Sequence, residues 1–181
     1  MNKYILAIMA FGTFFITGCG NGTKKTSDLE VVEVSTAEKV TYSAATTEAT
    51  FNDPKIATIY EYYIQLKTAL VNTDAIATAT QASNLMTAFA NIGVEEEVLK
   101  ATQVIAEATD VEVQRKAFVA VTDAVEKMLD GAITSGVIYK QFCPMAFDFE
   151  GAFWLSNSKQ ISNPYFGDKM LRCGKVDSEI K

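Results

Sequence analysis

Two cysteines and two methionines near the C-terminus are the residues of this sequence best suited to chemistry. They form two short pairs, Cys143 with Met145 and Met170 with Cys173. A spacing of two places both side chains of the first pair on one face of an extended strand. A spacing of three places the second pair on one side of a helical turn. Because thiolate and thioether sulfurs are soft ligands that select Cu(I), we expect these four residues to form a Cu(I) site.

The same cysteines could instead form a disulfide. Cys143 and Cys173 are two of only three cysteines in the chain, and disulfides persist in oxidising compartments. Such a bond would close a loop worth about 3–4 kcal/mol in the chain-entropy account of disulfide stabilisation. Met145 and Met170 would then be ordinary core residues. A third alternative is a pair of free, buried thiols, and redox chemistry could switch the pair between thiol and disulfide.

The absence of histidine excludes several other kinds of chemistry. Without imidazole the chain can carry no Ser-His-Asp or Cys-His catalysis and no His-ligated zinc. The sequence also lacks the Cys-x-x-Cys spacing of thiol oxidoreductases and the acidic loop of an EF-hand. We therefore expect no enzyme and no organic cofactor. The formal net charge of −6 argues against a nucleic-acid partner, because no basic stripe is present to neutralise phosphates.

The first 18 residues have the features of a bacterial lipoprotein signal peptide. The basic residue Lys3 precedes an apolar run, Ile5–Ile16, that is too short to span a bilayer. The run leads into Ile16-Thr17-Gly18-Cys19, which resembles a lipobox, where the cysteine becomes the lipidated first residue. We predict that Cys19 anchors an exported protein in the cell envelope, with the outer membrane favoured because no aspartate follows it. The alternative is an ordinary secretory signal with an incidental cysteine.

Composition divides the remainder into a tether and a folded domain. Residues 19–52 are rich in Thr, Ser, Ala and Glu without helical periodicity, so we expect a flexible tether. Residues 53–181 should form the folded domain. Within this domain we place a helical bundle at 54–136 and a tail rich in Cys, Met and aromatic residues at 137–181.

Four apolar runs with helical spacing predict a mainly α domain. Asp53-Pro54 suits a helix start, Asn72-Thr73-Asp74 separates the first two runs, and Gly93 suits the end of the second. Thr109-x-x-Glu112 has the form of a capping box for the fourth run. The third and fourth runs could also be one long kinked helix. Because short connections make successive helices antiparallel neighbours, we expect a four-helix, up-down bundle.

The C-terminal tail has a different character from the bundle. Aromatic residues concentrate between Tyr139 and Phe166, a stretch that also holds the single tryptophan. The patterns at 137–142 and 152–155 predict short β-strands, and 162–167 has turn chemistry. We expect the aromatic side chains to clamp the tail onto the bundle.

The tail also carries a long, ordered motif. It reads Cys143-Pro144-Met145-Ala146, then Gly151-Ala152-Phe153-Trp154-Leu155-Ser156-Asn157, then Asn163-Pro164-Tyr165-Phe166-Gly167-Asp168-Lys169-Met170-Leu171-Arg172-Cys173-Gly174. With Tyr63-x-x-Leu66-Lys67-x-Ala69-Leu70-Val71-x-Thr73-Asp74 in the first predicted helix, the chain strongly resembles the domain of unknown function 3347 family over residues 54–179. That family occurs as stand-alone envelope proteins and fused to periplasmic adaptor subunits of heavy-metal efflux pumps. The resemblance implies copper or other soft-metal handling, with efflux components as partners, and no established catalysis.

Overall fold

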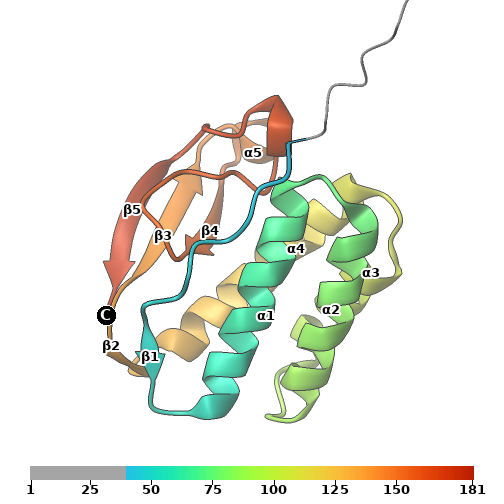
Figure 1. Cartoon of the computed structure of the whole chain (residues 1–181). Helices are drawn as coiled ribbons and strands as arrows, with labels where there is room; N and C mark the ends of the chain where they lie inside the picture. Colours follow the sequence, from blue (N-terminus) through green and yellow to red (C-terminus); the bar gives the residue numbers. More distant parts are fainter. Residues whose placement is uncertain (1–39) are drawn as a thin grey trace, which may run out of the picture. The chain divides into compact units, whose positions relative to one another are not determined.

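Residues 40–181 are described by a computed structural model, which shows a mainly helical domain with antiparallel strands in its C-terminal region (Figure 1). The predicted signal peptide, Cys19 and the first part of the predicted tether lie outside the described residues. The helices are α1 (Pro54–Val71), α2 (Ala75–Ala90), α3 (Glu96–Glu107), α4 (Val111–Leu129) and the short α5 (Ala146–Phe149). Within residues 40–181, no helix is long and apolar enough to cross a membrane.

Acidic side chains fix where the helices begin. The Asp53 carboxylate accepts a hydrogen bond from the backbone N–H two residues later, and Pro54 occupies the first helical position. Asp74 caps α2 by accepting from the N–H three residues later. Both helix starts confirm the sequence analysis. The predicted capping box at Thr109 is wrong by one residue, because Asp110 provides the cap of α4.

The four long helices bury one continuous apolar core. Helix α1 packs against α2 and α4, and α3 packs against α2 and α4. The fully buried core side chains include Tyr63, Leu66, Leu70, Leu85, Phe89, Ile105, Phe118, Val125 and Leu129. Residues 108–110 separate α3 from α4, so the alternative of one long kinked helix is wrong. Ile76 in α2 is 83% exposed, because α2 buries the face that carries Leu85 and Phe89.

The strands form two antiparallel sheets. The smaller one pairs β1 (Thr50–Phe51) with β2 (Ile133–Ser135), and the larger has the order β4 (Ala152–Ser156), β3 (Ile138–Cys143), β5 (Lys175–Ile180). The sequence predicted β3 and β4. It did not predict β5, whose side chains are exposed or half-buried and show no clean apolar alternation. Strands β1 and β2 were also missed, since each has only two or three residues.

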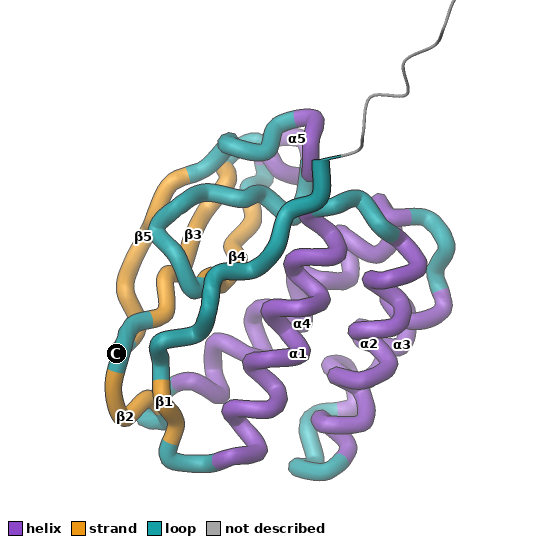
Figure 2. The backbone as a smooth tube through the Cα atoms, in the orientation of Figure 1, coloured by secondary structure: helices purple, strands orange, loops and turns teal. Residues whose placement is uncertain are grey.

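The C-terminal part of the predicted tether is packed against the domain. We call residues 40–49 the N-terminal strap. The backbone N–H of Tyr42 donates to Asn72 Oδ1 at 2.8 Å, and Asn72 Nδ2 donates to the Tyr42 carbonyl. Further along, Asn157 Nδ2 donates to the Ala45 carbonyl and to Thr47 Oγ1. Figure 2 shows the strap as a loop running alongside α1 toward β1. The predicted boundary at residue 52 is therefore corrected: ordered packing begins upstream of it.

A buried arginine joins α4 to α1 and to the tail. Arg115 is 1% exposed, and its Nε donates to the Pro164 carbonyl at 2.8 Å. One terminal nitrogen donates to the Leu70 carbonyl and Thr73 Oγ1 at the end of α1, and the other pairs with Glu112 at 2.7 Å. Through its hydrogen bond to Pro164, this side chain connects the Asn163–Gly167 segment of the motif to α4 and α1.

Candidate functional site

The structure brings the two tail cysteines into contact. Cys143 is the last residue of β3, and Cys173 lies just before β5. Because these strands pair with Phe142 opposite Lys175, the two cysteines lie beside each other at the same end of the sheet. Their sulfur atoms are 3.0 Å apart, and both are free thiols. The predicted proximity of Cys143 and Cys173 is therefore present.

The β3–β4 hairpin, whose connection of residues 144–151 includes α5, holds Cys143 in the core. Cys143 is fully buried and pairs with Ala152 across β3 and β4. Gly151 precedes the second strand with φ +80°, and a Cβ there would lie 2.5 Å from the Phe142 ring. Only glycine meets both demands, which accounts for its place in the motif.

A buried asparagine holds the segment that carries Cys173. Asn163 is fully buried, its Nδ2 donates to the Cys173 carbonyl at 2.8 Å, and its backbone N–H donates to the Leu171 carbonyl. The N–H of Cys173 in turn donates to the Met170 carbonyl at 3.0 Å, so residues 170–173 form a turn. Gly174 follows with φ +140°, where a Cβ would lie 2.8 Å from Trp154. The thiol of Cys173 is half-buried, so the pair has one inner and one outer sulfur.

The methionines are placed differently from the cysteines. Strand β3 ends at Cys143, and Met145 has a helical backbone conformation with 40% of its surface exposed. The expectation that Cys143 and Met145 share a face of one extended strand is therefore wrong, because the chain turns at Pro144. Met170 and Cys173 do lie in one turn, although that turn is not helical. Among residues 40–181, the hydrogen-bonding contact of the two thiols is with each other and not with a methionine sulfur.

The backbone that begins two residues after Met145 is strained. Phe147, Asp148 and Phe149 have consecutive positive φ values of 51°, 55° and 73°. Left-handed backbone costs roughly 1–2 kcal/mol at each residue that carries a side chain. Such conformations concentrate at functional sites, where the surrounding structure must hold them. Here the N–H of Gly151 closes the segment by donating to the Ala146 carbonyl at 2.9 Å.

The aromatic side chains of the tail pack against the helices, as expected. Tyr165 contacts Phe118 of α4 with ring centroids 6.0 Å apart, and it meets Trp154 and Phe147 edge-on. Its hydroxyl donates to the Phe153 carbonyl. Tyr165 therefore connects the bundle, the hairpin and the strained turn beside the thiols.

The arrangement of the thiols is compatible with two chemistries. Hydrogen bonding with Cys143 and, secondly, burial raise the pKa of Cys173 to about 11, so this residue is a protonated thiol at neutral pH. A metal ion would have to displace its proton. Two thiolates on a tetrahedral ion, with metal–sulfur bonds of about 2.3 Å, lie about 3.8 Å apart. The distance between the two sulfur atoms would have to increase by somewhat less than 1 Å for the pair to bind such an ion. The same distance would have to decrease for the pair to form a disulfide.

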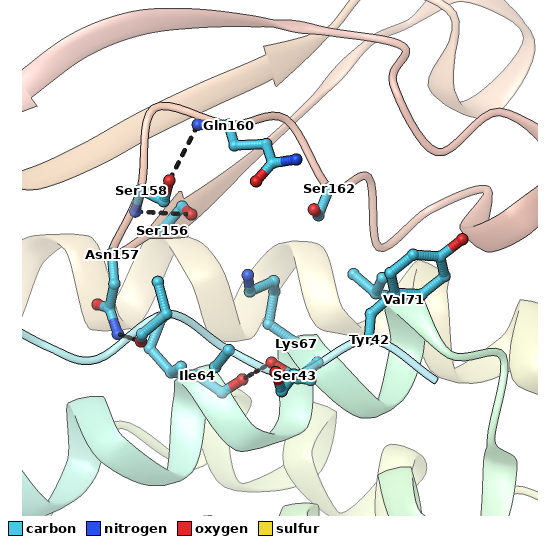
Figure 3. A pocket seen from close by; sticks show the side chains of 13 residues that line it. Tyr42, Ser43, Ile64, Lys67, Val71, Ser156, Asn157, Ser158, Gln160 and Ser162 are labelled. Atoms are coloured by element: carbon cyan, nitrogen blue, oxygen red, sulfur yellow. Dashed lines mark hydrogen bonds between the residues drawn. The ribbon is translucent and has the colours of Figure 1, made fainter. Parts of the chain in front are cut away.

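Sequence reasoning missed two buried charges, Arg115 in α4 and Lys67 in α1. Arg115 has hydrogen-bond partners, whereas Lys67 faces a cavity. The Lys67 side chain enters this cavity of about 200 Å³ between α1, the strap and the segment after β4 (Figure 3). The sequence does contain a pattern that indicates burial of Lys67. The residue lies three positions after Ile64 and four before Val71, which places it on the apolar face of a helix.

Comparison with known proteins finds one family model that matches part of the chain. No curated protein and no solved structure matches it. A family model described as "Protein of unknown function (DUF3347)" matches residues 59–135, from α1 to β2. The matched segment includes the Tyr63–Asp74 motif of α1, while the cysteine-containing motif of the tail lies beyond it. Through its helical region the chain is similar to the DUF3347 family.

Proposed function

We propose that this chain is a lipid-anchored envelope protein that binds a soft metal ion, Cu(I), in copper or heavy-metal homeostasis or efflux. The observation that supports this most is the contact between the Cys143 and Cys173 sulfurs, 3.0 Å apart in a chain without histidine. Soft sulfur donors select Cu(I) over Ca²⁺ and Mg²⁺. The half-buried Cys173 gives an ion a way in from solvent. The proposed role is binding and transfer, not catalysis.

A disulfide-stapled structural or interaction protein is the second candidate. The same 3.0 Å contact favours it, because thiols already in contact need little movement to bond. Exchange with an envelope disulfide donor would remove two protons and two electrons from the pair, and the donor would be reduced to two thiols. The reduced pair could bind Cu(I), whereas the oxidised pair could not. The metal-binding function therefore requires reduced cysteines, and the structural function requires the disulfide.

The thioethers complete the proposed site. If Met145 and Met170 are ligands, replacing either by leucine should weaken Cu(I) binding tenfold or more, about 1.4 kcal/mol. Leucine has nearly the volume of methionine, so the melting temperature should change little. The measurement is competition with a Cu(I) chelator on reduced protein. Met128→Leu, in α4, is the matched control. Unchanged affinity in both tail variants would leave the cysteines as the only proposed ligands.

Membrane attachment is proposed to occur through Cys19, with residues 19–39 as the tether and the outer membrane as the location. Metabolic labelling with a palmitate analogue should label the wild-type protein, and the label should disappear in Cys19→Ala. The variant should also leave the membrane fraction, because the remaining domain has no described helix able to span a bilayer. A variant that still carries the label and still sediments with membranes would refute the anchor.

The helical region and its partners are the remaining part of the proposal. We infer that α1 to α4 form an antiparallel up-down bundle, since successive helices pack together and their connections are short. Heavy-metal efflux components are the proposed partners for metal transfer. The acidic net charge of −6 is compatible with a protein that attracts cations and avoids nucleic acid.

A further inference from the structure

Lys67 is a buried cation in the middle of α1. Only 6% of its surface is exposed, and its helical neighbours on the same face are the buried residues Ile64 and Val71. Lysine is almost never this buried without a partner, because removing an ammonium group from water is costly. Its position therefore requires an explanation that packing alone does not give.

The Lys67 amine has no partner among the residues that the structure describes. None of the hydrogen bonds and ion pairs within residues 40–181 involves its Nζ. Two other cations differ: the buried Arg115 makes four hydrogen bonds, and the half-buried Lys140 pairs with Glu126 at 2.7 Å. Burial alone lowers the pKa of Lys67 to about 8, with no charged neighbour offsetting it. The amine therefore remains largely protonated at neutral pH while lacking a counter-charge.

The amine points into a polar, partly enclosed cavity. Figure 3 shows it directed from α1 toward the segment that carries Ser156, Gln160 and Ser162. The strap covers the other side with Tyr42 and the three residues after it. No acidic residue lines this cavity, so nothing in its described wall neutralises the ammonium group.

The cavity wall also offers hydrogen-bond donors. The Ser156 hydroxyl accepts from the N–H of Ser158, and the Ser158 hydroxyl accepts from the N–H of Gln160. Each hydroxyl hydrogen is therefore left to donate elsewhere. A volume of about 200 Å³ corresponds to roughly six water molecules, which sets the size of a ligand.

We infer that this cavity binds a small oxyanion, such as a carboxylate, sulfate or phosphate, with Lys67 as its counter-charge and serine hydroxyls as donors. The oxyanion would supply the negative charge that the wall lacks, and its oxygens would accept from the ammonium group and the hydroxyls. The site is separate from Cys143 and Cys173, so it does not depend on the proposed metal chemistry.

Calorimetric titration of the full-length protein in detergent tests this inference. The probes are inorganic sulfate, inorganic phosphate, acetate and succinate, each at constant ionic strength set with sodium chloride. We expect saturable binding of at least one probe at one site per chain. Lys67→Met keeps most of the side-chain volume and should weaken that binding at least tenfold. Lys55→Met, which removes an exposed charge from the same helix, should leave it unchanged.

Two further measurements test the site independently of the Lys67→Met variant. Ser158→Ala removes a donor but leaves the charge of Lys67 in place, and it should weaken binding severalfold. This variant tests the site independently if Lys67→Met alters the fold. Thermal melts of each variant show whether the fold is kept. Affinity should also fall as the pH rises above about 8, where the amine of Lys67 loses its proton. Tyr42, on the strap, is the other titratable side chain lining the cavity, and α1 and residues 156–162 add none. Absence of saturable binding by all four probes, or equal affinity in Lys67→Met, would overturn the inference.

Discussion

Replacing Arg115 by methionine should lower the free energy of unfolding by about 2–5 kcal/mol, since each of two acceptors left without a donor costs roughly 1–3 kcal/mol. The guanidinium is 1% exposed and donates to the carbonyls of Leu70 and Pro164. Methionine can fill the space but donates nothing, so the Pro164 carbonyl and the Thr73 hydroxyl lose their donor inside the protein. The Leu70 carbonyl keeps its hydrogen bond from the backbone N–H of Thr73. Because the lost bonds connect α4, α1 and the tail, the tail should also become more sensitive to protease.

Urea unfolding followed by circular dichroism measures this effect. Lys116→Met is the matched control, since Lys116 is the next residue on α4 and is exposed. It should change the free energy of unfolding by less than about 0.5 kcal/mol. If Arg115→Met cost no more than the control, the arginine would not be what holds the tail to the helices.

Replacing either Cys143 or Cys173 by serine should reduce Cu(I) affinity roughly a hundredfold or more, about 2.8 kcal/mol. Each change removes one of two thiolates whose sulfurs lie 3.0 Å apart, and a hydroxyl is a poor ligand for a soft ion. Competition with a Cu(I) chelator under reducing conditions measures the loss. In the same reduced state, both variants should melt close to the wild-type temperature.

The disulfide alternative predicts a different pattern for the same two variants. Without reductant, each serine variant would lose about 3–4 kcal/mol of stability relative to the oxidised wild-type protein. The double variant would lose little more than either single one, because the cysteines act as one unit. Copper affinity would then be negligible in the oxidised wild-type protein and in all the serine variants. Melts of the oxidised and reduced proteins, run beside the titrations, separate the two accounts.

Local signals in the sequence predicted the helices well. Asp53 and Asp74 cap the helices that they were expected to cap, because an N-cap depends on a side chain and its own backbone neighbours. The hairpin strands β3 and β4 were also predicted, since each combines β-branched or aromatic residues with nearby turn signals. The proximity of Cys143 and Cys173 was predicted, because both the Cu(I) site and the disulfide require it, but the sequence did not distinguish between the two.

What could not be predicted depends on long-range contacts. The strap is bound mainly through its backbone, by Asn72 and Asn157, so its polar side chains give no pattern that distinguishes it from a tether. The β5 segment forms a strand because it pairs with β3, which lies more than thirty residues earlier in the sequence. The left-handed turn around Phe147 contradicts local preference, and tertiary packing must impose it.

The central claim is tested most directly by the stoichiometry of Cu(I) binding to the fully reduced, full-length protein. A chelator-competition titration should reach its end point at one Cu(I) per chain, and the bound form should resist subsequent oxidation of Cys143 and Cys173. If the reduced protein removed no copper from the chelator, and its two thiols re-formed a disulfide at the same rate with and without Cu(I), the metal-binding account would be contradicted.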